Sequence, residues 1–430
     1  MLFAPGSSIL SAEGCFYPQT QFLRGKKMTD SYKLPLYGDG VHDDSDAIQE
    51  RLDSGISCVE LPPTDKCYLI SKTLKIHSNQ ELRLQRATVI RLAPESDCTM
   101  LENAGGRMGD RNVFITGGIW DFANVDQFPN PMQLEHVKKP LTRSRPEKYS
   151  GTAMEFRNVS GFRLQGVIFR NPTIFAATFH KVTNFVMDDI EFDFTTCNPA
   201  WANMDGIHLN GSCAYGRISN LRGNCYDDLV ALNSPEGDWP GPITDIDIDG
   251  IQCDSCHSAI RLLSYTEPVR RISIRNIHGN FYRYMVGITH FVNDQPGPGI
   301  FDDITIENCY CGKCRKPEGL WDLMPMAPIL VEGFCDVGDL YIGNIHRDEF
   351  VENVPCIACN VDSDRPVIVD TKIRNLTVEN CSMTNHLPEE LEFFHCDCEV
   401  ESLTFRNNQC YSAPGAGPCI LKAGKFPEGK

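Results

Sequence analysis

Phe162–Phe169 reads FRLQGVIF, and Phe185–Phe192 reads FVMDDIEF. In both stretches the apolar residues are separated by two, three and two positions. A spacing of two is typical of a β-strand, whose alternate side chains point to one face, and the offset of three indicates a bend between two short strands. Each stretch can therefore direct all four apolar side chains into one interior.

This pattern, with small residues also allowed, occurs ten times. Its copies begin at Val113, Phe162, Phe185, Gly216, Ile246, Ile272, Ile304, Leu340, Leu376 and Leu403. Counted from the second position of each copy, the intervals are 49, 23, 31, 30, 26, 32, 36, 36 and 27 residues, and all but the first lie in the range of a structural repeat. We interpret the interval of 49 residues as one degenerate coil plus an insertion.

Stacked coils explain this repeat better than the other folds do. The spacing does not stay on one face of a helix, and a β-sandwich does not bend at the same place in ten successive segments. The sequence therefore predicts an all-β fold, a right-handed parallel β-helix (solenoid). In such a fold each coil buries its apolar side chains against those of its neighbours.

We expect residues 1–30 to form an N-terminal extension and residues 31–430 to form a single β-helix domain. A segment at 124–150 breaks the repeat and carries five basic residues in an otherwise acidic chain. It is either a solvated loop or a lid that reaches over a coil face and meets an anionic substrate.

The two ends of the solenoid need covering. Residues 43–54 place Ala47, Ile48 and Leu52 on one side and offer Asp44 or Ser45 as N-cap, so we expect a short capping helix at the N-terminal end. The last twenty residues are rich in Pro and Gly and predict a loop over the C-terminal end.

Net charge and the first residues narrow the possible partners and location. The chain carries a formal charge of −17, which argues against nucleic acid or an anionic membrane as partner. No apolar run is long enough for a membrane span. The first residues contain Pro5 and no basic residue before Arg24, which makes a poor signal peptide, and Met28 could be an alternative start. We therefore expect a cytoplasmic protein.

Twenty cysteines in a chain without an export signal indicate reduced thiols or metal ligands rather than a disulfide framework. Three C-x-x-C pairs occur, but they lie on different coils at irregular separations. Inward packing accounts for many of the cysteines, since Cys behaves there as a small hydrophobic residue. The inward positions of the repeat include Cys253, Cys309, Cys311, Cys381 and Cys410. We expect no metal, and no dinucleotide, phosphate-loop or H-E-x-x-H motif indicates a cofactor.

Asp227 and Asp228 stand side by side before an apolar run, which raises the question of how two adjacent carboxylates are tolerated. Asp205 lies one short coil earlier, and His257 lies about one coil later. Residues one coil apart stack in a solenoid, so we expect these four to converge on an outward-facing cleft. Neighbouring carboxylates raise one another's pKa, which allows an acid and a base to coexist near neutral pH. Glycoside hydrolysis needs such a pair.

Several motifs in order resemble the polygalacturonase family, glycoside hydrolase family 28, of the pectate-lyase-like β-helix superfamily. YGDGVHDDSDAIQ, GGIWDFANVDQF and NPTIFAATFHKVTNFVMDDIEFD are similar to the family's N-terminal phrases. NMDG, YDDLVAL and CHSAIRLLS are similar to its N-T-D-G, G-D-D-x-V-A-I and G-H-G-x-x-x-G-S motifs. The resemblance spans about residues 37–300.

The resemblance implies an inverting hydrolase. Asp227 would be the general acid, Asp205 and Asp228 would orient and activate the water, and His257 would tune the proton of Asp227. The family's motif glycines are replaced here, by Tyr226 before the Asp pair and by Cys256 and Ser258 around His257.

A second departure affects the expected substrate. The family's R-I-K motif binds a substrate carboxylate, and its Arg and Lys positions align with Thr289 and Phe291. We therefore expect a substrate other than simple polygalacturonate. Arg261 could replace this clamp or be a surface charge, and the basic 124–150 segment is another candidate.

Further residues near the same face are candidates for contact with an oligosaccharide. Asn203 and His208 flank Asp205, and His290 follows the aligned clamp region. Trp201 and Trp239 could stack on sugar rings, although each is as well explained by packing. The sequence leaves the oligomeric state open.

Three functions remain open at this point. The first is a glycosidase that acts on imported oligosaccharides. The second is a lyase, epimerase or intramolecular glycosyl (fructosyl) transferase on the same scaffold, for which Ca²⁺ held by carboxylates and an Arg or Lys base would be typical. The third is a non-catalytic carbohydrate-binding or tailspike-like protein, in which the Asp residues form only a polar ladder.

Overall fold

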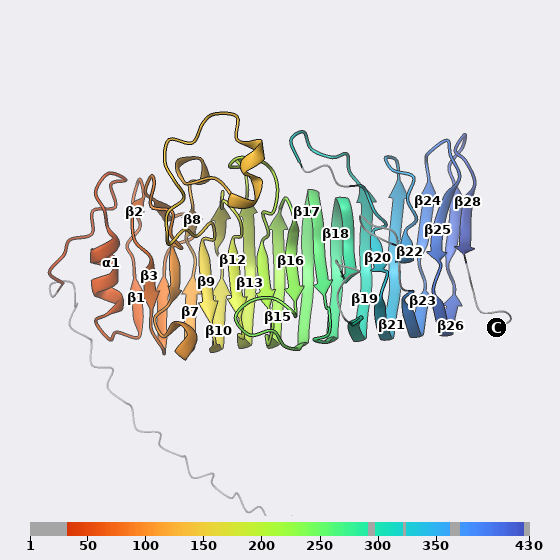
Figure 1. Cartoon of the computed structure of the whole chain (residues 1–430), viewed down its shortest axis with the longest axis horizontal. Helices are drawn as coiled ribbons and strands as arrows, with labels where there is room; N and C mark the ends of the chain where they lie inside the picture. Colours follow the sequence, from red (N-terminus) through yellow and green to blue (C-terminus); the bar gives the residue numbers. More distant parts are fainter. Residues whose placement is uncertain (1–31, 291–296, 321–323, 362–369, 425–430) are drawn as a thin grey trace, which may run out of the picture. The chain divides into compact units, whose positions relative to one another are not determined.

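The strands of this chain lie parallel and stack coil upon coil, as Figure 1 shows for the length of the stack from β1 to β28. The computed structural model describes residues 32–290, 297–320, 324–361 and 370–424. The chain divides into two units, Met1–Lys33 and Leu34–Lys430, and the coils belong to the second. The expected extension at 1–30 lies outside the described residues. The predicted fold class, a parallel β-helix, is confirmed.

The first coils use three short strands each, one for every face of the β-helix. β1, β4, β7 and β10 pair on the first face, β2, β5, β8 and β11 on the second, and β3, β6, β9 and β12 on the third. Their bounds are β1 Cys58–Glu60, β2 Tyr68–Ile70, β3 Leu74–Ile76, β4 Gln80–Arg83, β5 Val89–Leu92, β6 Leu101–Asn103, β7 Asp110–Thr116, β8 Ile119–Asp121, β9 Met154–Arg157, β10 Val159–Gln165, β11 Ile168–Arg170 and β12 Ala177–His180.

Later coils merge neighbouring faces into longer strands. β13, β15, β19 and β21 run through the first and second faces, and β17 and β18 continue into the third. The bounds are β13 Thr183–Asp193, β14 Ile207–Asn210, β15 Ala214–Gly223, β16 Asp228–Asn233, β17 Ile243–Leu263, β18 Val269–Thr289, β19 Gly299–Lys313, β20 Ile329–Glu332, β21 Cys335–Glu349, β22 Ile357–Val361, β23 Lys372–Glu379, β24 Ser382–Asn385, β25 Leu391–Cys396, β26 Glu399–Arg406, β27 Gln409–Ser412 and β28 Cys419–Gly424.

The repeat read from the sequence corresponds to the first and second faces. The ten starting positions, from Val113 to Leu403, form one continuous ladder of directly paired residues. β10 pairs directly with β7, so no coil is skipped in the interval of 49 residues and the insertion alone accounts for it. The ladder also extends earlier than predicted, because Gln80 of β4 pairs with Val113.

Residues with a left-handed backbone conformation produce the bend between the first two faces. Asn220, Asn276 and Asn344 occupy this position in three coils with φ between 53° and 59°. Asn tolerates the left-handed region better than most residues. Its amide also joins adjacent coils, as where Asn344 Nδ2 donates to Asn308 Oδ1 at 3.0 Å. The predicted offset of three residues is therefore a turn built from these residues.

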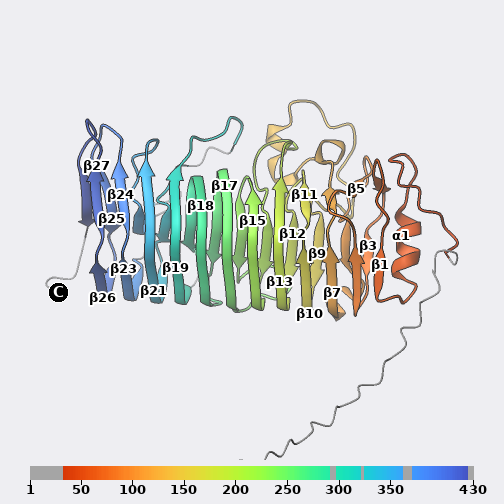
Figure 2. The same cartoon turned by 180° about the vertical axis from the view of Figure 1, so that it is seen from behind.

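The N-terminal end of the stack is covered by helix α1, Ser45–Leu52, beside β1 and β3 (Figures 1 and 2). It buries Ala47, Ile48 and Leu52 against the first coils, as predicted. Asp44 is the N-cap residue, but its side chain does not cap the helix. Its two carboxylate oxygens accept instead from the backbone N of Tyr37 and Gly38.

The C-terminal end differs from the loop that the sequence predicts. β28 lies in the last twenty residues and pairs with β25, adding one more strand to the third face. Residues 425–430 lie outside the described ones. The last coil is less well covered than the interior coils, since Leu403, Phe405 and Cys410 are only half-buried.

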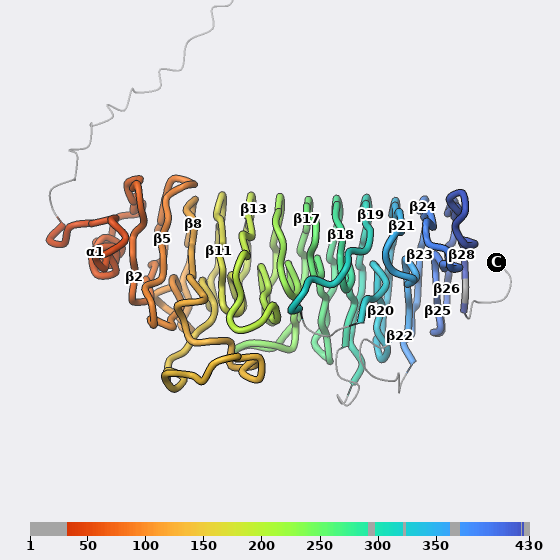
Figure 3. The backbone as a smooth tube through the Cα atoms, turned by 90° about the horizontal axis from the view of Figure 1, so that it is seen from above, coloured from red at the N-terminus to blue at the C-terminus, as the bar shows by residue number. Residues whose placement is uncertain are grey.

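The segment at 124–150 projects on the same side as β20 and β22, the side of the third face (Figure 3). It contains the 3₁₀ turns η2 Asn124–Asp126 and η3 Pro131–His136; a third, η1 Gly106–Met108, precedes β7. The insertion is tied to the segment before Trp201, because Asn198 Nδ2 donates to the carbonyls of Asn124 and Gln127.

The basic residues of this insertion divide into two groups. Arg143 forms an ion pair with the buried Asp97, so its charge serves the fold. The other four are exposed: Lys138, Lys139, Arg145 and Lys148. A lid over a substrate stays a prediction.

Most of the cysteines predicted to face inward do so. Cys253, Cys309, Cys311 and Cys381 are buried, whereas Cys410 is half-buried because it lies in the terminal coil. Within the described ranges, no C-x-x-C pair belongs to a cluster of three potential metal ligands. No helix of the described residues is long and apolar enough to cross a membrane.

Candidate active site

Asp205 and Asp228 lie at the starts of β14 and β16, which are neighbouring strands of the third face. The backbone N of Gly206 donates to the carbonyl of Asp228 at 3.0 Å, and the backbone N of Asp228 donates to Asp205 Oδ1 at 3.2 Å. A Cβ on Gly206 would lie 2.4 Å from the carbonyl oxygen of Leu229. Glycine therefore allows the two strand starts to approach, and the predicted stacking of the two aspartates is found.

Asp205 is buried and bound to His208. Its Oδ2 lies 2.6 Å from His208 Nδ1, and Glu236 Oε2 lies 3.1 Å from His208 Nε2. Burial alone would lower the pKa of His208, but the hydrogen bonds to the two carboxylates raise it to about 10. The pKa of Glu236 falls to about 2, because the bond to His208 outweighs the effect of burial. At neutral pH His208 is thus a cation between two carboxylates.

Asp228 is held by two residues from later coils. The hydroxyl of Tyr284 donates to Asp228 Oδ1 at 3.0 Å, and Arg261 lies 3.6 Å from Asp228 Oδ2. Burial and the charge of Asp205 raise the pKa of Asp228 to about 6, while Arg261 and Tyr284 limit the rise. Asp228 is therefore mostly ionised at pH 7.

Asp227 differs from Asp228 in exposure. Its side chain is 17% exposed, against 1% for Asp228. Burial among its neighbours, with the charges of Asp228 and Asp205, raises the pKa of Asp227 well above its ordinary value. Both adjacent carboxyl groups thus have a raised pKa, and of the two only the Asp227 side chain reaches the surface.

His257 lies beside Asp227, as the resemblance implies. Its Nδ1 is 3.7 Å from Asp227 Oδ1, 3.2 Å from the Asp227 carbonyl and 3.0 Å from Ser258 Oγ. Burial, together with the charge of Arg283, lowers the pKa of His257 to about 3. A neutral imidazole adds no positive charge that would ionise Asp227.

The same residues could hold a metal ion. Asp227, Asp228 and His257 each offer one ligand atom, and these atoms lie within 4.8 Å of one another. Two carboxylates and an imidazole suit a divalent cation such as Zn²⁺ or Mn²⁺ better than Ca²⁺, which prefers oxygen ligands. The expectation of a site without metal therefore needs an experimental test.

The four residues of the predicted cleft differ in how far they reach the surface, and the cleft itself stays a prediction. Asp205, Asp228 and His257 are 3%, 1% and 4% exposed, so only Asp227 reaches the surface. Burial is tolerated because the buried charges have partners: His208 of the same coil binds Asp205, and Arg261 and Tyr284 of later coils lie against Asp228. This burial matters chemically, since it is the first cause of the raised pKa values of Asp227 and Asp228.

Four of the six predicted substrate-binding residues lie at or next to this cluster. His208 and Arg261 contact Asp205 and Asp228 directly. The ring of Trp201 packs 4.1 Å from that of Tyr226, the neighbour of Asp227. Asn203, two residues before Asp205, has a left-handed backbone and a buried Oδ1 without a hydrogen-bond partner.

The other two predicted substrate-binding residues, Trp239 and His290, lie away from the Asp cluster. Trp239 follows the far end of β16, and its ring lies under Arg107 and Lys181 at 5.4 Å each. His290 follows β18 and is 1% exposed, with its Nε2 2.9 Å from the carbonyl of Gly297. The role of His290 in substrate binding stays a prediction, for a residue that is buried at the far end of β18.

Two residues that contact the cluster, Tyr284 and Glu236, were not recognised from the sequence. Tyr284 pairs in register with Ser258, which pairs with Asp228, so the spacing of the coils could have pointed to it. Glu236 lies in the loop after β16, where no periodic signal exists. Thr289, aligned with the clamp arginine, is buried and accepts from Arg261 Nε at 3.3 Å. Phe291 lies outside the described residues.

No protein-family model matches the chain, and no curated protein matches it. Among solved structures it is similar to PfbA, a surface adhesin of Streptococcus pneumoniae, with TM-score 0.60 and 13% identity over 91% of this chain and 92% of that one. It is also similar to the Yersinia enterocolitica family 28 exopolygalacturonase, with TM-score 0.56 and 14% identity over 91% and 77% of the two chains. The A-module of the Azotobacter vinelandii mannuronan C-5 epimerase AlgE6 matches with TM-score 0.57 and 12% identity over 91% and 98%. At such identities these likenesses show the fold alone.

Proposed function

We propose that this chain is a glycoside hydrolase that cleaves an O-glycosidic bond in an oligosaccharide, with Asp227 as the general acid. The observation that carries the proposal is the convergence of the carboxyl groups of Asp205, Asp227 and Asp228, of which only that of Asp227 reaches the surface. Asp227 has a strongly raised pKa and a partly exposed side chain, while Asp228 has a pKa of about 6 and is buried. An acid that can donate at neutral pH must remain protonated there and must reach the substrate.

Asp205 and Asp228 would orient and activate the attacking water. Asp205 Oδ1 is bound to the backbone of Asp228, so the two carboxyl groups keep a fixed relationship. The nearest oxygens of Asp227 and Asp228 lie within 4.8 Å, closer than the roughly 6.5–9.5 Å between acid and base in inverting glycosidases. The anomeric configuration of the product is therefore part of the test.

The surroundings of Arg261 support a substrate other than simple polygalacturonate. Its guanidinium lies between Asp228 and Thr289, 3.6 Å from the carboxylate. A cation already engaged with the site's own carboxylate is a poor clamp for a uronic acid. The fold similarity to the family 28 exopolygalacturonase fits a hydrolase and does not indicate the sugar.

The test is a product assay against neutral and uronic oligosaccharides, followed by proton NMR of the anomeric region. Wild type should release new reducing ends of inverted configuration, and Asp227→Asn should lose about a thousandfold or more in kcat, since it removes the acid. Asp193→Asn, which changes a half-exposed carboxylate paired with Arg170 on another face, is the matched control. Turnover that survives in Asp227→Asn would contradict the proposal.

A metal-dependent lyase or epimerase is the second candidate, favoured by one observation. Asp227, Asp228 and His257 bring three ligand atoms together, and Arg261 lies beside them as a possible base. The fold similarity to the mannuronan C-5 epimerase A-module fits this alternative. An unsaturated product absorbing in the ultraviolet, or epimerised sugar without new reducing ends, would favour it over hydrolysis.

A further inference from the structure

A hollow of about 590 Å³ lies on the second face, away from the Asp cluster of Asp205, Asp227 and Asp228. It is lined by residues of β18, β19, β21 and β24, and a second hollow of about 280 Å³ lies over β15, β17 and β18. Both are lined by His278. We call the two hollows together the lateral groove. None of the three aspartates lines either hollow.

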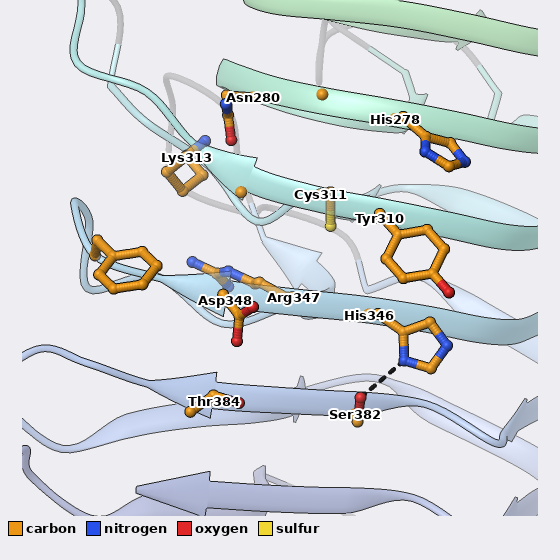
Figure 4. A pocket seen from close by; sticks show the side chains of 13 residues that line it. His278, Asn280, Tyr310, Cys311, Lys313, His346, Arg347, Asp348, Ser382 and Thr384 are labelled. Atoms are coloured by element: carbon orange, nitrogen blue, oxygen red, sulfur yellow. Dashed lines mark hydrogen bonds between the residues drawn. The ribbon is translucent and has the colours of Figure 1, made fainter. Parts of the chain in front are cut away.

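A column of rings forms one side of the lateral groove. His278, Tyr310 and His346 come from successive coils and are paired in register, as Figure 4 shows. Ring centroids are 5.1 Å apart between His278 and Tyr310 and 4.9 Å apart between Tyr310 and His346. His346 Nδ1 lies 2.8 Å from Ser382 Oγ, which fixes its ring. The column therefore runs along the axis of the stack.

These rings are accessible from solvent. Tyr310 is 55% exposed, and Phe350, which also lines the larger hollow, is 63% exposed and stacks on His386 with ring centroids 4.0 Å apart. Stacked outward rings stabilise neighbouring strands by themselves. A purely structural ladder, however, does not require an adjoining hollow that is lined by a further exposed ring.

The charged residues of the groove floor are already engaged. Lys313 Nζ donates to the carbonyls of Tyr282, Arg283 and Met326 at 2.5–2.8 Å, which uses all three of its donors. The guanidinium of Arg347 binds Glu349 at 2.6–2.9 Å. Neither cation therefore offers the groove a free site for an anionic ligand.

Arg222, which lines the smaller hollow, is likewise engaged, with Glu191 and Asp189. The other polar groups that line the larger hollow are mostly neutral or acidic. Asn280, Ser382 and Thr384 supply amide and hydroxyl groups, and Asp348 supplies an exposed carboxylate. The chain as a whole carries a charge of −17. Hydroxyl-rich, uncharged ligands match this set, because they can donate to Asp348 and exchange hydrogen bonds with the amides and hydroxyls.

We propose that the lateral groove binds a neutral oligosaccharide chain that lies along the stack axis, with its sugar rings against the column of His278, Tyr310 and His346. Sugar rings have apolar C–H faces that pack on aromatic rings and equatorial hydroxyls that meet the polar side chains. Successive coils repeat every ~4.8 Å, which gives an extended chain a regular series of contacts. The choice of a carbohydrate rests on the proposed function, whereas the groove itself does not depend on catalysis.

The test uses the full chain with Asp227→Asn as background, so that ligands are not consumed. Saturation-transfer NMR and titration calorimetry compare neutral hexasaccharides of xylose, glucose, mannose and galactose with a uronic hexasaccharide. Tyr310→Ala should weaken binding of the preferred neutral hexasaccharide by about tenfold, whereas Tyr310→Phe should keep it, because the phenyl ring preserves the stacking. Tyr215→Ala, at an exposed tyrosine outside both hollows, should behave as the background.

The outcomes separate this proposal from the proposed hydrolysis. Three results would contradict sugar binding in the lateral groove, even if wild type hydrolyses sugars. They are unchanged binding in Tyr310→Ala, no binding of any neutral hexasaccharide, and a preference for the uronic hexasaccharide. Binding lost in Tyr310→Ala alone, in a protein without detectable turnover, would support the groove and contradict the hydrolase. A thermal unfolding curve for each variant shows that the substituted proteins are folded.

Discussion

The backbone N of Asp228 donates to the carboxylate of Asp205 at 3.2 Å, although 23 residues separate the two. This bond joins two coils where each enters the third face. It also sets two negative charges side by side in a buried place, and their repulsion is part of the reason for the raised pKa of Asp228. The chemistry proposed for the cluster depends on this spacing.

Removing one hydrogen bond should move the pH profile. Tyr284 lowers the pKa of Asp228 by donating to its carboxylate, so Tyr284→Phe should raise that pKa above about 6. Since Asp228 must be ionised to activate water, the acidic limb of kcat/KM should shift to higher pH by about one unit. A pH–rate profile measures this shift. Tyr282→Phe is the control, and an unchanged acidic limb in Tyr284→Phe would remove Asp228 from the base role.

The buried cation of His208 should make stability depend on pH. Its pKa is about 10 when folded against an ordinary 6.5, so its contribution is fully present below pH 6.5 and is lost as pH rises through 10. That contribution is at most about 5 kcal/mol, since one pKa unit corresponds to about 1.4 kcal/mol. His208→Gln should flatten the fall of the denaturation midpoint between pH 6.5 and 10. An equally steep fall in the variant would contradict this assignment.

Gly206 should tolerate no side chain. Its added Cβ would lie 2.4 Å from the Leu229 carbonyl oxygen and 2.8 Å from the Phe192 ring. Gly206→Ala should therefore separate the starts of β14 and β16, with a cost of about 1–3 kcal/mol and loss of most activity. Chemical denaturation and the product assay measure the two effects. Gly55→Ala is a demanding control: the added Cβ meets nothing within 4 Å, but Gly55 has a left-handed backbone (φ 76°), which Gly206 does not have.

Interior coils should be more sensitive to truncation than the last coil. Ile274 is fully buried between Ile248 and Ile306, so Ile274→Ala should cost about 2–5 kcal/mol. Leu403, in the terminal coil, is only half-buried, so Leu403→Ala should cost clearly less. Denaturation followed by circular dichroism compares them. Equal costs for the two variants would contradict this prediction, because they would mean that Leu403 packs as tightly as Ile274.

A chelator distinguishes the two enzymatic candidates. Hydrolysis by Asp227 with Asp205 and Asp228 requires no metal, so activity should be unchanged after treatment with EDTA and dialysis. A loss restored by Mn²⁺, Zn²⁺ or Ca²⁺ would instead indicate that Asp227, Asp228 and His257 bind the ion. In that case the lyase or epimerase alternative becomes the better explanation.

The sequence by itself determined the fold and most of the central cluster. The repeat predicts the ladder from Val113 to Leu403 because a solenoid packs each apolar position on the same position of the next coil, so local spacing carries the tertiary register. The same regularity brings Asp205, Asp228 and His257 together. The cytoplasmic location and the short substrate stay predictions.

Only the tertiary structure decided how deep the cluster lies and what surrounds it. The third face is built from strands that the repeat pattern does not include, and its loops differ in length from coil to coil. Trp239 and His290 therefore lie away from the place that the sequence suggested, while Tyr284 and Glu236 lie at the cluster. Burial and the distances between charges on different coils set the pKa values, and no local pattern of residues encodes these quantities.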